Sequence, residues 1–380
     1  MTHRLRRFRF NLPQRIAAVL LLLFLAQGVW LGSRHALMES DSHFARCGSE
    51  VWERSGQLTG NDIGCGGVSD GILAYRLAGL PLVLNRLSFC QTADRAAQPV
   101  GELSAGELLI ARLPFLLAGV LLGGGLWWVT RRLYGNLGGY TALALYCFSP
   151  AMLKACMALN PEVLAALGVY AGVYTAIGVA HAMQGPPAKW RPRIVLLTAA
   201  FGLAAGAHLA ALLAAALLGL AFMLWVAEGH RSQVLPVLLA ASAGAMALVF
   251  ACYGFQPAAF SDFFRPLAGL LGFSLAPAWR FFLAPGNAGI TVAVAAAGLL
   301  FLRFRRSRYF GNATPLLCAL ALMLLARPGA DGALWALPFL LTFVAGLFAD
   351  AYESRHGRWA VAAGAAIVLL QAACCVLSLL

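Results

Sequence analysis

Residues 194–227 read IVLLTAAFGLAAGAHLAALLAAALLGLAFMLWVA, a run of about 34 residues that only His208 interrupts with an ionisable side chain. A helix that crosses a membrane needs roughly 20 apolar residues. The run is therefore long enough for two short spans, or for one span and a re-entrant segment. A stretch of this length and character is typical of a membrane protein.

The composition of the whole chain leads to the same class. Of the 380 residues, 61% are hydrophobic and 11% are charged, and the mean hydropathy is +0.77. About a quarter of the residues of a soluble domain carry charge. This apolar composition excludes collagen, disordered chains and nucleic-acid-binding proteins. The net charge of +13 is divided among short clusters between apolar runs, as expected for cytoplasmic arginines that anchor a membrane protein.

The apolar runs predict the number of spans. The first extends from Ile16 to Ser33, behind five arginines, and is longer than the apolar region of a signal peptide. We therefore predict an uncleaved first helix with a cytoplasmic N-terminus. Ten further runs begin near Leu108, Tyr140, Val163, Ile194, Ala211, Val234, Asn287, Pro315, Leu334 and Trp359. The expected fold is an all-α polytopic protein of about eleven transmembrane helices in the cytoplasmic (inner) membrane.

The charge pattern supports this topology. Basic clusters follow every second predicted span, as expected for cytoplasmic loops, at Arg131/Arg132, Lys189/Arg191/Arg193, Arg231, Arg303/Arg305/Arg306/Arg308 and Arg355/Arg358. The acidic residues concentrate between Arg34 and Glu107, which the same topology places outside the cytoplasm. Within this large first extracytoplasmic loop, the mixed pattern of Ile72 to Leu80 predicts a short amphipathic helix on the membrane surface. We expect chemistry in this loop.

Three motif stretches within about the first 230 residues carry a resemblance. They are Asp41-Ser42-His43-Phe44-Ala45-Arg46 followed by Glu53-Arg54-Ser55-Gly56; Ala111-Arg112-Leu113-Pro114 with Arg131-Arg132-Leu133-Tyr134-Gly135 and Phe148-Ser149-Pro150; and Asn160-Pro161-Glu162. In this order and spacing, the chain resembles the polyprenyl-phosphate-dependent C-type (GT-C) membrane glycosyltransferases. That family includes protein O-mannosyltransferases and aminoarabinose transferases. The resemblance implies a catalytic membrane module over residues 1–230 and a variable group of helices over 231–380.

The resemblance also implies an activity. A sugar would pass from a polyprenyl-phosphate-linked donor to a lipid, glycan or protein acceptor on the extracytoplasmic face, with inversion at the sugar carbon. Such a transfer needs a base for the acceptor hydroxyl and positive groups for the departing phosphate. Two other functions stay open from the sequence alone: a transporter or flippase of a lipid-linked substrate, and a catalytically silent scaffold subunit of this fold.

Two carboxylates are the candidate catalytic residues. Asp41 follows the first span and is the candidate base, although a side chain at this place also suits a helix cap. Glu162 follows Asn160-Pro161, so it falls in the first turn of a span, where the helix dipole alone favours a carboxylate. The pair could also hold a divalent cation. Ser42 stands where many family members carry a second acidic residue, which counts against a metal.

Four cations at membrane depth or at the outer boundary are candidates for binding the lipid phosphate. They are Lys154, His208, Arg280 and Arg327. An ionisable residue inside a span is costly, and it is therefore a functional candidate. Each has a plainer alternative: Lys154 can snorkel to the interface, His208 can pack by hydrogen bonding, Arg327 can pair with Asp331, and Arg280 can anchor beside Trp279.

The cysteines give one further expectation. Cys47, Cys65 and Cys90 lie in the extracytoplasmic loop, where an oxidising compartment permits one disulfide and leaves one thiol over. The other six lie in apolar runs and are expected to be packing residues.

Overall fold

The structure is a computed structural model that describes residues 11–34, 39–53, 71–88, 103–265, 275–303, 312–324, 332–355 and 357–380. Helices and no strands are found in these ranges. In chain order they are α1 (Leu12–Arg34), α2 (Glu39–Glu53), α3 (Ile72–Ser88), α4 (Ala105–Cys147), α5 (Pro150–Met157), α6 (Glu162–Met183), α7 (Pro187–Ala207), α8 (Leu209–Val226), α9 (Arg231–Cys252), α10 (Pro257–Asp262), α11 (Ala276–Leu283), a 3-10 turn η3 (Pro285–Asn287), α12 (Ala288–Arg303), α13 (Ala313–Leu324), α14 (Gly332–Tyr352) and α15 (Gly357–Leu379).

The polytopic all-α class is confirmed. Eight helices in the described ranges are long and apolar enough to cross a membrane. Each predicted span coincides with a helix or half of one, but α13 has 12 residues and α7 begins among charged residues. The exact number of eleven therefore stays a prediction.

Helix α4 contains two of the predicted spans. It is 43 residues long, and Gly135 inside it has φ 80°, a left-handed conformation that favours glycine. The Tyr146 hydroxyl donates a hydrogen bond of 2.6 Å to the carbonyl of Gly119, in the other half of the helix. The two halves therefore run back along each other. The chain breaks again at Phe148 and Ser149, so Lys154 lies on a separate helix, α5, rather than on the last turns of a span.

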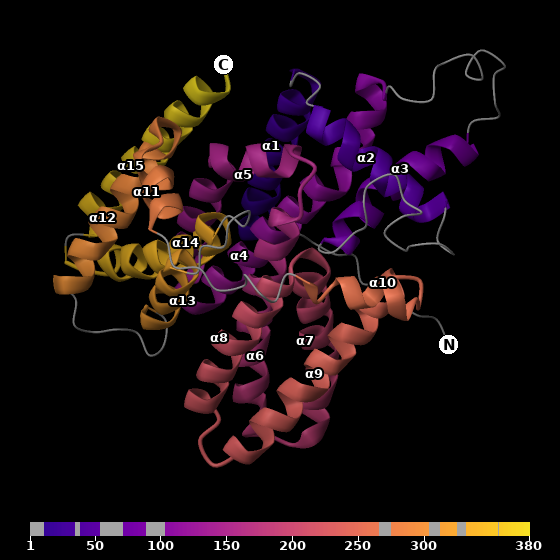
Figure 1. Cartoon of the computed structure of the whole chain (residues 1–380). Coiled ribbons are helices and arrows are strands. Elements are labelled where there is room, and N and C mark those ends of the chain that lie inside the picture. The colour runs from indigo at the N-terminus through magenta and orange to yellow at the C-terminus, as the bar shows by residue number, and fades with distance from the viewer. Residues whose placement is uncertain are drawn as a thin grey trace, which may run out of the picture.

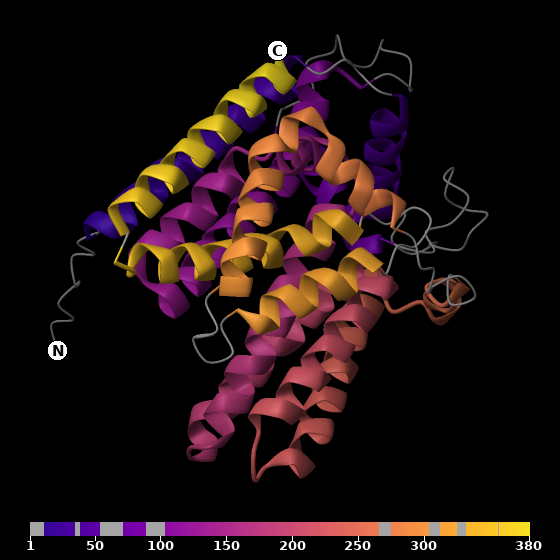
Figure 2. The same cartoon turned by 90° about the vertical axis from the view of Figure 1, so that its left-hand side faces the viewer.

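Helix α14 forms the centre of the molecule. The apolar stretch of this helix is entirely buried, and its neighbours include α4, α6, α12 and α13. Figure 1 shows α14 and α4 between the α2–α3 pair on one side and α11, α12 and α15 on the other. Helix α15 is lightly buried by comparison, and Figure 2 shows it running along the outer edge.

Helices α6 to α9 form a separate lobe, at the bottom of Figure 1. The run of residues 194–227 is resolved into two helices, α7 and α8, which His208 alone separates. Gly168 of α6 allows α6 and α7 to approach closely, since a Cβ at this position would lie 2.5 Å from the backbone nitrogen of Ala204. The beginning of α6 and the end of α7 therefore lie side by side, next to the α5–α6 turn.

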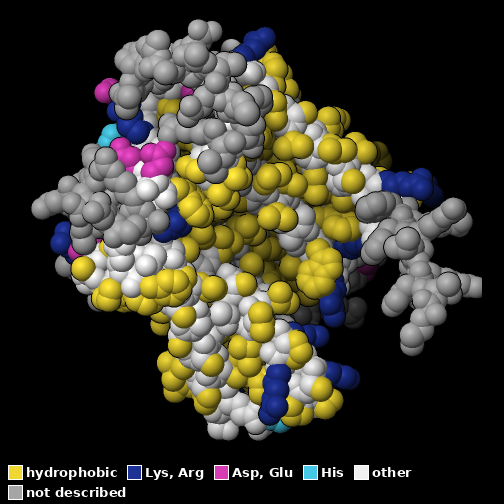
Figure 3. Space-filling model, turned by 90° about the vertical axis from the view of Figure 1, so that its right-hand side faces the viewer, with side chains coloured by type: hydrophobic (Ala, Val, Ile, Leu, Met, Phe, Trp, Pro, Cys, Tyr) yellow, Lys and Arg dark blue, Asp and Glu magenta, His cyan; other side chains and the backbone are white. Residues whose placement is uncertain are grey.

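Charged residues are separated along the molecule. At the far end of the lobe, the beginning of α7 carries Lys189, Arg191 and Arg193, and α9 begins with Arg231. Figure 3 shows Lys and Arg on this lower lobe. Asp and Glu gather at the upper left of the same view. The predicted amphipathic helix is present as α3, which packs crosswise on α2: a Cβ at Gly79 would lie 2.0 Å from the carbonyl oxygen of Gly48.

Candidate active site

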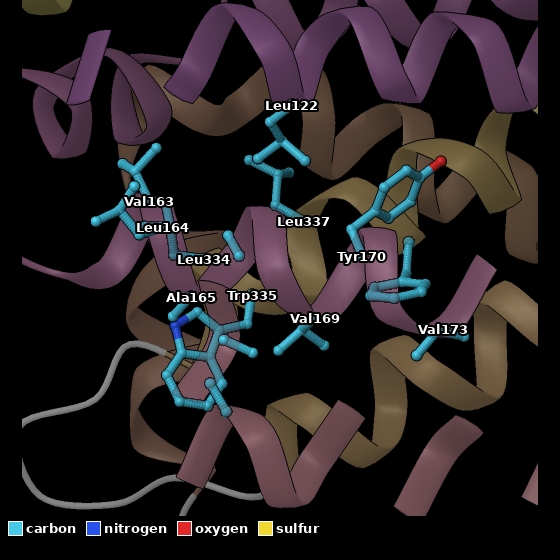
Figure 4. Packing of buried hydrophobic residues seen from close by; sticks show 14 of the residues in the cluster. Leu122, Val163, Leu164, Ala165, Val169, Tyr170, Val173, Leu334, Trp335 and Leu337 are labelled. Atoms are coloured by element: carbon cyan, nitrogen blue, oxygen red, sulfur yellow. The ribbon is translucent and has the colours of Figure 1, made fainter. Parts of the chain in front are cut away.

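The candidate site lies around the short turn between α5 and α6, residues 158–161. Asp41 of α2 contacts this turn, and Glu162 of α6 follows it. Arg112 of α4 contacts Asp41, and the α7–α8 junction and the beginning of α14 contact Glu162. Figure 4 shows Trp335 of α14 beside Ala165, just inside the beginning of α6. Chain segments far apart in the sequence thus place polar side chains in one buried region.

Asp41 lies in the first turn of α2 and is 8% exposed. Its Oδ2 forms an ion pair with Nη2 of Arg112, at 2.5 Å. Its Oδ1 accepts a longer hydrogen bond, 3.4 Å, from the amide of Leu159 in the α5–α6 turn. The side chain of Asp41 therefore joins the surface helix α2 to both α4 and the turn.

Arg112 is the cation nearest to Asp41. It lies in the first part of α4 and is 2% exposed, so its guanidinium balances the buried charge of Asp41. Its Nε–H has no hydrogen-bond partner within the described ranges. Arg112 thus retains a donor in a buried place, which is unusual for a native polar group.

Glu162 begins α6 on the other side of the turn and is 7% exposed. Its backbone amide donates to Oδ1 of Asn160, at 3.2 Å. Its Oε1 lies 3.3 Å from Nε2 of His208, and its Oε2 accepts a hydrogen bond of 2.7 Å from Nε1 of Trp335. Both carboxylate oxygens of Glu162 therefore contact ring nitrogens, one from the α7–α8 junction and one from α14.

His208 occupies the break between α7 and α8 rather than the face of a span. Its backbone is extended, with φ −150° and ψ 135°, its amide donates to Ala204, and its carbonyl accepts from Ala211 and Leu212. Its backbone thus ends one helix and begins the next.

The two candidate carboxylates approach the same turn. Asp41 binds the amide of Leu159, and Glu162 follows three residues later. The two predicted carboxylates therefore both lie next to the α5–α6 turn, although each carboxylate has its own partners. Arg112 stabilises one, and His208 with Trp335 stabilises the other.

A divalent cation does not fit this arrangement well. The carboxylate oxygens of Asp41 and Glu162 already accept from nitrogen groups, and Arg112 supplies the charge that a metal would supply. Hard cations take six or more oxygen ligands. In the part of the chain that the structure describes, no group of three or more His, Cys, Asp or Glu side chains is placed to hold a metal ion.

The other predicted phosphate ligands are not brought together here. Lys154 is exposed on α5. Arg280 is exposed on α11, and its Nε lies 3.4 Å from the carbonyl of Ala276 in the same helix. Arg327, like its possible partner Asp331, lies outside the described residues. Of the three cations within the described residues, His208 is the one that directly contacts a candidate carboxylate.

The cysteine expectations can be checked in part. Cys47 of α2 is disulfide-bonded, whereas Cys65 and Cys90 lie outside the described ranges. The six cysteines of the apolar runs are free, and Cys147, Cys156, Cys318 and Cys375 are buried, as expected of packing residues. One cysteine of this disulfide, Cys47, therefore lies in the helix that carries Asp41.

Two residues of the site were not selected from the sequence. Arg112 belongs to one of the quoted motifs, and a charged residue within a span is itself a functional signal. Trp335 gives no such signal, because an indole in an apolar run is usually a packing residue. Its contact with Glu162 depends on the docking of α14 against α6.

Comparisons with known proteins agree on the fold. No family model matches the chain, and no curated protein matches it by sequence. The crystal structure of ArnT from Cupriavidus metallidurans bound to undecaprenyl phosphate is similar, with a TM-score of 0.63 and 18% identity, over 93% of this chain and 62% of that one.

The archaeal oligosaccharyltransferase of Archaeoglobus fulgidus is also similar. Its apo crystal structure gives a TM-score of 0.57 with 12% identity, over 97% of this chain and 56% of that one. The chain thus spans less than two thirds of the length of these solved structures. Solved structures of these two proteins hold undecaprenyl phosphate and a dolichol-phosphate, respectively. This chain therefore has the fold of the polyprenyl-phosphate-dependent C-type membrane glycosyltransferases, the family that its sequence motifs resemble.

Proposed function

We propose that this protein transfers a sugar from a polyprenyl-phosphate-linked donor to an acceptor hydroxyl on the extracytoplasmic face of the membrane. The observation that carries the proposal is the pair of buried carboxylates, Asp41 and Glu162, on the two sides of the α5–α6 turn. The fold supports it, since a solved structure of the same fold holds undecaprenyl phosphate. The acceptor would be a lipid, a glycan or a protein.

In the proposed reaction, Asp41 is the base. The acceptor oxygen attacks the sugar carbon, the bond from that carbon to the phosphate oxygen breaks, and the acceptor proton passes to Asp41. The polyprenyl phosphate leaves with the bonding electrons, so the sugar carbon is inverted. Arg112 keeps Asp41 in place through their ion pair.

Glu162 supports this step by orienting the acceptor. It is fixed by His208 and Trp335, so it offers a carboxylate whose position varies little. A rigidly held group of this kind lowers the barrier by positioning its substrate rather than by forming bonds. Positive groups are needed for the phosphate that leaves, and Lys154, His208, Arg280 and Arg327 are proposed for this role, in the catalytic module of residues 1–230 and the helices that follow.

The test is donor turnover in membranes. Asp41→Asn keeps the size of the side chain and removes the base, so release of polyprenyl phosphate from a labelled lipid-linked sugar should fall by roughly a hundred-fold or more. Glu39→Gln is the matched control, because Glu39 is exposed in the same first turn of α2. It should leave the release unchanged.

Two results would contradict the proposal. Undiminished release by a correctly inserted Asp41→Asn variant would refute the role of Asp41. Movement of an intact lipid-linked sugar across the membrane, without release of polyprenyl phosphate by the wild-type protein, would instead indicate a flippase.

A further inference from the structure

The turn between α14 and α15 contains a hollow that the proposed function does not use. Its volume is about 710 Å³, and it is lined by Tyr352, Ser354, Arg355, Gly357, Arg358, Trp359 and Val361. Tyr352 ends the helix in which Trp335 is near the start, so the two lie roughly 25 Å apart along α14. The hollow is therefore at the end of α14 remote from the candidate active site.

The hollow is positively charged. Arg355 and Arg358 are exposed, and no acidic residue lines it. Neither arginine forms an ion pair with a carboxylate within the described ranges. A second, smaller hollow of about 370 Å³ differs in this respect, since Glu228 lines it together with Arg231. Charge alone thus favours an anion at the α14–α15 turn.

The surface that continues from the hollow is apolar. Trp359 is 79% exposed at the beginning of α15, and along the same helix Leu369 and Leu377 are 69% and 75% exposed. Tryptophan is enriched where a membrane meets water, and exposed leucines on a spanning helix face lipid chains. A small soluble anion would use the arginines but none of this apolar surface.

The wall of the hollow is connected to the core. The hydroxyl of Tyr352 lies 3.1 Å from Oγ1 of Thr141 in the second half of α4. A ring of Tyr352 also fills the space at Gly364 of α15, where a Cβ would lie 2.3 Å from its oxygen. The position of the turn is thus fixed relative to α4 and α15, which gives the two arginines a defined setting.

We propose that this hollow binds the headgroup phosphate of an anionic phospholipid of the bilayer. Arg355 and Arg358 contact the phosphate, Trp359 lies at headgroup level, and the acyl chains lie along α15. Basic pockets between spanning helices are known to select anionic headgroups, and arginine is suited to bind phosphate through two donors. The proposal does not depend on the sugar-transfer reaction.

The experiment measures lipid binding to the full-length protein in detergent by native mass spectrometry. The probes are phosphatidylglycerol and the neutral phosphatidylcholine. Wild type should retain phosphatidylglycerol and release phosphatidylcholine under the same conditions. Arg355→Gln with Arg358→Gln should weaken the binding of phosphatidylglycerol by roughly thirty-fold. Each Lys or Arg near an anionic lipid surface contributes about 1 kcal/mol to binding, and the loss of about 2 kcal/mol corresponds to this factor.

The matched control removes two charges elsewhere. Lys189→Gln with Arg191→Gln changes the net charge equally, at the exposed beginning of α7, and should leave binding unchanged. Equal loss in this control, or equal retention of phosphatidylcholine, would overturn the proposal. Displacement of bound phosphatidylglycerol by inorganic phosphate or by polyprenyl phosphate would also overturn it, because the hollow would then serve another ligand.

A second pair of variants separates binding from folding. Arg355→Lys with Arg358→Lys keeps both charges and should retain most of the phosphatidylglycerol. Trp359→Ala keeps both arginines and should weaken binding several-fold through loss of the contact at headgroup level. Unchanged binding by a folded Arg355→Gln variant, together with unchanged binding by Trp359→Ala, would contradict the assignment of this hollow.

Discussion

The indole of Trp335 donates a hydrogen bond of 2.7 Å to Oε2 of Glu162, although the two residues are 173 positions apart in the chain. This bond joins the central helix α14 to the first turn of α6. His208 holds the other carboxylate oxygen from the α7–α8 junction. Glu162 is thus fixed by two helical segments on different sides, and removing either contact should disturb the site more than the fold.

Trp335→Phe tests the indole contact. The ring volume is largely kept, but the donor to Glu162 is lost, and a hydrogen bond to a charged group contributes about 1.5–3 kcal/mol. We expect sugar transfer to fall by roughly ten-fold or more, with a smaller fall in the thermal unfolding midpoint. Trp279→Phe is the control, since Trp279 is 67% exposed on α11; equal losses in both variants would contradict the positioning role.

Arg112→Met tests the buried ion pair. This change leaves the carboxylate of Asp41 buried without its cation, which costs about 3–5 kcal/mol in free energy of unfolding. Adding Asp41→Asn should restore part of that stability, because the uncompensated charge is then removed. Denaturant unfolding in detergent measures both effects.

Arg265→Met is the contrasting variant for this ion pair. Arg265 pairs with Asp262 at 3.0 Å, but its side chain is 74% exposed. Exposed pairs contribute about 0–1 kcal/mol, so this change should have little effect on unfolding. A loss as large as that of Arg112→Met would show that burial does not determine the cost.

Gly168→Ala tests the close approach of α6 and α7. The added Cβ would lie 2.5 Å from the backbone of Ala204, so the helices must separate. Overpacking of this kind costs about 1–3 kcal/mol. Gly178→Ala in the same helix is the control, because nothing lies within 4 Å of its Cβ position, and thermal unfolding should show a lower midpoint for the first variant alone.

Gln371→Leu tests how α15 is held. The amide of Gln371 accepts from the backbone of Ile290 and donates to the carbonyls of Phe148 and Gly286, at 2.8–2.9 Å. Leucine leaves these buried backbone groups without a partner, at about 1–3 kcal/mol for each. We expect a lower thermal midpoint and faster proteolysis near α15; Gln233→Leu, at an exposed position of α9, should change neither.

The sequence predicted the helices well, since apolar runs separated by charged residues are a property of the chain itself. It also indicated that the α7–α8 run would break near His208, although it left two arrangements open. The partner of Asp41 could have been identified, because Arg112 is a charge inside an apolar run. Whether the site residues act as proposed stays a prediction.

The contact of Trp335 with Glu162 could not be predicted in this way. It arises where α14 docks against α6, and the packing of two apolar helices is not encoded in any short motif. The C-terminal helices of residues 231–380 were expected to be variable. Helix α14, which is one of them, supplies the hydrogen-bond donor of Trp335 to Glu162. The candidate site therefore includes a residue from beyond position 230.

The full burial of α14 has a consequence for how the protein is made. Ribosomes deliver the chain from its N-terminus, so α14 is inserted after α4 and α6, two of the helices that it packs against. Helices α4 and α6 are then in the bilayer before their contacts with α14 can form. Until α14 is in place, Glu162 lacks its indole donor, so the insertion of this helix is the step that supplies Trp335 to the site.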